Sequence, residues 1–85
     1  MAQKMLITKE QYHELTPIGK EIHEYWMKWK PEMYREMHKE GTLWTTLYSE
    51  SERLHEMIIQ MMQDGASEDM AKEVARAEIY GELTE

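Results

Sequence analysis

The longest regular pattern of apolar and polar residues runs from Leu43 to Gln63. At 100° per residue, most of its apolar side chains share one arc of a helix: Leu43, Leu47, Leu54, Met57, Ile58 and Met61. Four further residues widen the arc on one side: Tyr48, His55, Ile59 and Met62. We therefore expect one long central helix that packs against two neighbours, with Leu54 fully buried near the middle of the arc.

A charged residue interrupts this arc, because Glu50 lies at its middle beside Ser51. In one interpretation the helix breaks and restarts at Ser49, with Ser49 and Glu52 as a capping box. In the other the helix is continuous and Glu50 has a partner. We favour the continuous helix.

The N-terminal part predicts an arm followed by a short helix. Residues 1–8 hold consecutive rather than periodic apolar residues, which favours an extended arm. Thr8 and Gln11 have the spacing of a capping box for a short helix over residues 9–15. Pro17 ends that helix, because proline disfavours a helical conformation in the residue before it.

Two helices are predicted between this arm and the central helix. Thr16 and Pro17 fit an N-cap and a first helical position, and this helix ends before Pro31. Pro31 begins the next helix and Gly41 ends it, so that the central helix starts at Thr42 or Thr45. The side chains expected to be buried are Ile18, Ile22, Tyr25, Trp26 and Trp29 in the first, and Met33, Tyr34 and Met37 in the second.

The last helix is predicted to follow the break at Asp64 and Gly65, with Ser67 as its cap and Gly81 as its end. Its apolar stripe should consist of Met70, Val74 and Ala77, and three small residues should allow close approach to the central helix: Ala71, Ala75 and Ala77. The fold class is therefore all-α, a small bundle of three to five helices around one long helix. We expect a single domain, with residues 1–16 as an arm with a short helix and residues 17–85 as the helical body.

Composition narrows the classes of function. The chain has 85 residues and no cysteine, which excludes disulfides, thiolate metal sites and a thiol nucleophile. No apolar run reaches the ~18 residues of a membrane span, and the first eight residues are too short for a secretory signal. We expect a cytoplasmic protein that does not bind membranes.

The net charge of −7 is concentrated in the second half, where residues 40–85 hold eleven acidic and three basic residues. Binding to a phosphate backbone needs clustered basic residues. The one concentration of basic residues is interleaved with glutamates and comprises Lys20, Lys28, Lys30, Arg35 and Lys39. Nucleic acid is therefore not the default partner.

Candidate catalytic and metal sites are weak. Glu10 with His13, and Glu52 with His55, have the Glu-x-x-His spacing that occurs in di-iron bundles. Glutamate is abundant, however, and the helix with His13 is short, so we expect no metal and no cofactor. His23 and His38 have no neighbours that indicate a nucleophile or proton relay, and we expect no enzyme activity. The interaction candidates are Trp44, Tyr48, His55, Ile59 and Met62, because aromatic residues and methionine are frequent in protein interfaces.

Short motifs along residues 17–80 occur in the order typical of one family. They are Pro17-Ile18-Gly19-Lys20, Tyr25-Trp26, Lys30-Pro31, Tyr34, Gly41-Thr42-Leu43 and the alanine- and glutamate-rich residues 71–80. In this order and spacing the chain resembles the transposon-encoded TnpV family. Trp26 stands where that family has leucine, and residues 1–16 do not match. The resemblance implies a small helical accessory protein of a bacterial mobile genetic element, and it implies no catalytic residues.

Three hypotheses for function follow. The first is a non-enzymatic protein that acts by binding a protein partner of unknown identity, with a homodimer as one form. The second is a weak nucleic-acid-binding module that uses the basic residues between Lys20 and Lys39. The third is an acidic inhibitor that occupies the nucleic-acid channel of a host defence protein through residues 40–85, since complementary charge speeds such encounters.

Overall fold

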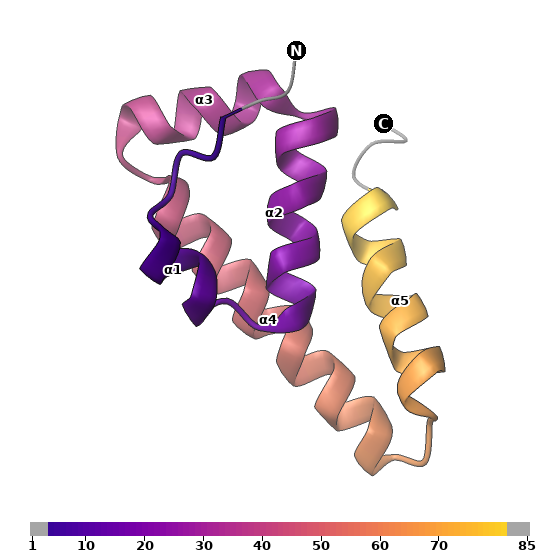
Figure 1. Cartoon of the computed structure of the whole chain (residues 1–85). Coiled ribbons are helices and arrows are strands. Elements are labelled where there is room, and N and C mark those ends of the chain that lie inside the picture. The colour runs from indigo at the N-terminus through magenta and orange to yellow at the C-terminus, as the bar shows by residue number, and fades with distance from the viewer. Residues whose placement is uncertain (1–3, 82–85) are drawn as a thin grey trace.

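The computed structural model describes residues 4–81, which form five helices and, within that range, no strand (Figure 1). The helices are α1 (Lys9–Glu14), α2 (Pro17–Trp29), α3 (Pro31–Glu40), α4 (Leu43–Gln63) and α5 (Glu68–Gly81). α2 and α5 pack along the long helix α4, and α3 joins α2 to α4. The predicted all-α bundle around one long central helix is therefore confirmed. None of the described helices is long and apolar enough to cross a membrane.

Three helices begin at the predicted residues. At each of these starts a side chain accepts a hydrogen bond from a backbone N–H group that has no partner within the helix. The Thr8 hydroxyl accepts from the Gln11 N–H at 3.0 Å, and the Gln11 side chain accepts from the Thr8 N–H at 2.9 Å. Thr16 caps α2 through a 3.1 Å bond from the Gly19 N–H. Ser67 accepts from the Met70 N–H at 3.2 Å. Such caps typically contribute about 1 kcal/mol each.

The turns after α3 and α4 depend on glycine. Gly41 adopts φ +80° and Gly65 adopts φ +105°, both in the left-handed region that side chains disfavour. Both glycines lie where the sequence predicts a helix to end. α4 follows Thr42 directly, although the Thr42 side chain makes no capping hydrogen bond.

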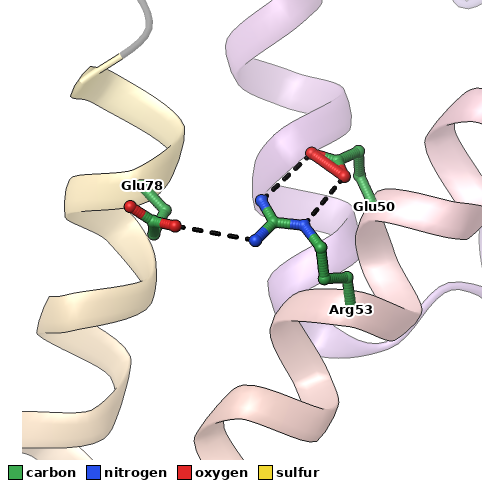
Figure 2. Close-up of polar contacts among 3 residues, drawn as sticks. All are labelled: Glu50, Arg53 and Glu78. Atoms are coloured by element: carbon green, nitrogen blue, oxygen red, sulfur yellow. Dashed lines mark hydrogen bonds and ion pairs between the residues drawn. The ribbon is translucent and has the colours of Figure 1, made fainter.

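α4 is continuous, and Glu50 has a partner (Figure 2). Arg53 donates to both carboxylate oxygens of Glu50, at 3.0 and 3.2 Å, and its other terminal nitrogen lies 3.6 Å from a carboxylate oxygen of Glu78 on α5. Glu50 is partly exposed, whereas the next residue, Ser51, belongs to the buried face and is fully buried.

The reason for a serine at this point is the close approach of α2. A Cβ atom added to Gly19 would collide with the Ser51 hydroxyl and lie 2.6 Å from the Ser51 Cβ. The Ser51 hydroxyl lies 2.9 Å from the Thr16 hydroxyl, so the cap of α2 also satisfies this buried polar group. The two helices therefore meet at a contact that only small residues permit.

The core is built from all parts of the described chain. Leu54 is only 2% exposed, as predicted. Ile7 from the arm and Leu15 after α1 are buried with it, so the N-terminal segment packs on the same core as the rest.

The expected buried faces of α2 and α3 are found in part. In α3 only Tyr34 is fully buried, whereas Met33 and Met37 are partly buried against the core. In α2 the exception is Trp29, which is 59% exposed. Trp29 is the last residue of α2, where the chain turns into α3 and leaves the core behind.

The predicted apolar stripe of α5 is wrong. Met70 and Val74 are 57% and 40% exposed, and Ala77 is exposed as well. The buried face consists instead of Ala71, Ala75 and Ile79. Small alanines let α5 approach its neighbours closely, and two ion pairs flank this face: Arg76 with Glu21 on α2, and Glu78 with Arg53 on α4. Close packing and these pairs together set the rotation of α5.

Candidate interaction surface

The five predicted interaction residues share one side of α4 but form two separate groups. Trp44 packs partly on the core, and its ring lies 5.4 Å from that of Tyr48, which is 40% exposed. His55, Ile59 and Met62 lie farther along α4 and line a small cleft of about 140 Å³ between α2, α4 and α5. Trp44 and Tyr48 do not line it.

A larger hollow is lined by residues of α1, α2 and α5. It has a volume of about 390 Å³, and we call it the aromatic cleft. Its lining residues are Tyr12, Lys20, Glu21, Glu24, Tyr25, Lys28, Trp29 and Tyr80. The chain has three tryptophans and five tyrosines, so half of its aromatic residues line this one surface.

The rings of the aromatic cleft combine a buried base with exposed edges. Tyr25 is only 7% exposed, and its ring lies 4.8 Å from that of Tyr80, which is 47% exposed. Lys28 places its ammonium 5.3 Å from the centre of the Trp29 ring, and Lys20 lies at the same distance from the Tyr12 ring. These are cation–π distances. Aromatic and cationic groups therefore alternate along α2.

An ion pair fixes the α5 side of the cleft. Arg76 donates to both carboxylate oxygens of Glu21, at 2.8 and 3.2 Å. Hydrogen bonding to Glu21 raises the pKa of Arg76 above its ordinary value. The bidentate geometry holds α5 against α2. In contrast, the side chains of Lys20, Glu24 and Lys28 form no ion pair within residues 4–81.

A buried polar pair supports the α1 side. The His23 Nε2 lies 2.7 Å from the Tyr34 hydroxyl, which also accepts a 2.9 Å hydrogen bond from the Leu6 N–H. The Tyr12 ring packs edge-on against His23, with centroids 5.6 Å apart. Both members of the pair are fully buried. Tyr12 therefore owes its position to a contact that links the arm, α2 and α3.

Burial determines the protonation of this pair. Loss of solvent lowers the pKa of His23 below its ordinary value, and the nearby Glu24 opposes this only in part. The same loss of solvent raises the pKa of Tyr34. The Tyr34 hydroxyl oxygen accepts from the Leu6 N–H, so the hydroxyl proton of Tyr34 is best donated to the Nε2 of a neutral His23. Among the described residues, the His23 Nδ1 has no hydrogen-bond partner, so the pair is poorly suited to accept a second proton.

The residues with Glu-x-x-His spacing are not gathered into a metal site. Within residues 4–81 there is no group of three or more His, Asp, Glu or Cys side chains that could hold an ion. His13 is exposed on α1, and His55 lies on α4 at the small cleft.

None of the five predicted interaction residues lines the aromatic cleft, so sequence reasoning missed this site. Trp29 has the periodicity of a core residue, and Tyr80 stands near the end of the chain. His23 shows its role only next to Tyr34, which is on another helix. The one signal in the sequence is the alternation of Lys20, Glu24 and Lys28 on one side of α2.

Comparison with models of known protein families, with curated proteins and with solved structures finds no match. The geometry of these surfaces is therefore the basis for the proposals that follow.

Proposed function

We propose that this protein is a small non-enzymatic interaction protein that binds a protein partner through the aromatic cleft. The observation that carries this proposal is that Trp29 and Tyr80 are both exposed and line the same cleft, together with Tyr25 and Lys28. Exposed apolar side chains that lie together in one surface patch commonly mark an interaction site. Tryptophan and tyrosine are also the residues that most often dominate binding energy in protein interfaces.

The form of the surface supports a binding role over catalysis. The cleft is lined by tyrosine, tryptophan, lysine and glutamate, and its two lysines lie over aromatic rings. Its rigid elements are held by the Glu21–Arg76 pair and by the packing of Tyr12 on His23. A preformed surface loses less conformational entropy on binding than one that must be ordered.

The biological context is a separate proposal. The motifs between Pro17 and Tyr80 resemble the TnpV family in order and spacing, and we propose on this basis that the protein is an accessory factor of a bacterial mobile genetic element. The genes beside its coding sequence test this: transposition or conjugation genes are expected, and a stable chromosomal operon would contradict it.

Two alternatives have less support. An acidic inhibitor would need free carboxylates, and three of the eleven acidic residues in residues 40–85 are instead paired within the chain: Glu50 and Glu78 with Arg53, and Glu68 with Lys72. A nucleic-acid-binding module would need its basic residues together. Lys20 and Lys28 instead lie on α2 over aromatic rings, and Arg35 and Lys39 lie on α3.

Affinity capture with matched baits tests the binding proposal. The first bait is the unchanged protein, the second carries Trp29→Ala, and the third carries Met70→Ala. Trp29 and Met70 are 59% and 57% exposed, so both substitutions remove a large exposed side chain at little cost in stability. Met70 lies outside the aromatic cleft.

The proposal predicts a protein that the unchanged and Met70→Ala baits retain and that the Trp29→Ala bait loses. Equal retention by all three baits would contradict it. The retained protein could also be a nuclease or another nucleic-acid enzyme whose capture depends on Trp29. That result would support the interaction proposal and would also support the inhibitor function.

A further inference from the structure

We propose that the aromatic cleft binds a polypeptide segment in which an apolar anchor side chain is flanked by carboxylates. This inference rests on the proposed function and adds the chemistry of the partner. The structural basis is the cleft itself, with its ring-lined base and its two lysines on α2.

The size and lining favour an apolar anchor. A volume of about 390 Å³ lies near the lower end of the range for ligand pockets. Tyr25 and Tyr80 form a tilted ring pair, and Trp29 exposes most of its surface beside them. An apolar or aromatic side chain can therefore pack against ring faces and edges.

The charges of the cleft favour a flanking anion. Glu21 is committed to Arg76, with contacts of 2.8 and 3.2 Å. The lining charges without an ion pair in the described chain are Lys20, Lys28 and Glu24, so the cleft has a local excess of one positive charge. The whole chain carries −7. The cleft is thus a positive site on a negative protein, and complementary charge on the partner would select it.

The positions of the lysines disfavour a cationic partner. Each ammonium already lies over a ring face, Lys20 over Tyr12 and Lys28 over Trp29, at 5.3 Å. A ligand cation would have to displace a lysine from that face and would be repelled by it. A carboxylate can instead pair with the lysine in place.

A polypeptide fits better than a single-stranded nucleic acid. Single strands also stack on aromatic rings beside basic residues, but they need a continuous positive groove along their backbone. Here Glu24 lies between Lys20 and Lys28, one helical turn from each. Isolated carboxylates can pair with the two lysines and avoid Glu24, whereas a phosphate at every nucleotide cannot.

Peptide titration followed by NMR tests the inference on the intact chain. The probes are three blocked hexapeptides with a central phenylalanine-leucine pair, flanked on both sides by glutamates, lysines or serines, together with oligothymidylate. The readout is the shift of the Trp29 indole signal. We expect the acidic peptide to bind about tenfold more tightly than the basic one, because each exposed ion pair contributes modestly.

Two charge reversals provide a matched comparison. Lys28→Glu and Lys39→Glu each change the net charge by the same amount, but only Lys28 lines the cleft. Lys28→Glu should remove the preference for the acidic peptide and Lys39→Glu should preserve it. Circular dichroism spectra matching that of the unchanged protein show that both variants are folded.

The outcomes separate the two proposals. If the serine and lysine peptides move the Trp29 signal as strongly as the acidic peptide, the charge inference fails and the cleft remains a peptide site. If oligothymidylate binds there more tightly than every peptide, the polypeptide inference fails. If no probe moves the signal and capture from lysate does not depend on Trp29, the proposed function fails as well.

Discussion

At the scale of single residues, the most informative side chain is His23. It is fully buried between Tyr12 of α1 and Tyr34 of α3, with Glu24 as the nearby charge on its own helix. A protonated His23 would donate from Nε2 and deprive the Tyr34 hydroxyl proton of its acceptor. His23 therefore contributes to the fold in its neutral form.

This arrangement predicts a loss of stability in acid. Because burial lowers the pKa of His23 below 6.5, the unfolded chain takes up this proton first as the pH falls. The stability that neutral His23 contributes to the folded state is thus fully present above pH 6.5. It decreases as the pH falls from there toward the lowered pKa of His23. Urea unfolding between pH 8 and pH 4.5 measures it.

Two glutamine variants isolate the effect. His23→Gln should flatten this part of the pH dependence, whatever its effect on stability at neutral pH. His38→Gln, at an exposed position of α3, should leave the dependence unchanged. Parallel curves for His23→Gln and the unchanged protein would show that His23 does not titrate between the two states.

At the scale of helices, α4 organises the core. Leu54 is 2% exposed, and Glu56 two residues later is exposed. Removing a buried leucine side chain typically costs about 2–5 kcal/mol, and the total stability of a small domain is only ~5 kcal/mol. Leu54→Ala should therefore leave the protein largely unfolded or close to it at room temperature, whereas Glu56→Ala should change stability by less than about 0.5 kcal/mol.

Denaturant unfolding of both variants checks this expectation. A midpoint much lower for Leu54→Ala than for Glu56→Ala is predicted. Equal midpoints would mean that α4 does not present Leu54 to the core, and the architecture would be wrong.

The helices also show which structural features local sequence signals can predict. Capping residues and prolines predicted the starts of α1 and α2, because those signals act within four residues. The rotation of α5 was not predictable in this way. Apolarity favoured Met70 and Val74, but the buried face follows Ala71 and Ala75, two of the three small residues that were expected to allow close approach to the central helix.

At the scale of the whole molecule, the site depends on contacts that periodicity does not encode. Tyr12, Trp29 and Tyr80 come from three helices and line one cleft only after α1 and α5 have packed on α2. Trp29 was expected in the core because it continues the apolar face of α2. It is exposed because α2 ends at Trp29 and the chain changes direction at Lys30.

The central claim is that the aromatic cleft is the surface by which the protein acts. Site-specific photo-crosslinking in cells tests it most directly, with the reactive residue in place of Trp29 or, as the matched control, in place of Met70. We predict a discrete crosslinked product with one polypeptide from position 29 and none from position 70. The same products from both positions, or none from position 29, would contradict the claim.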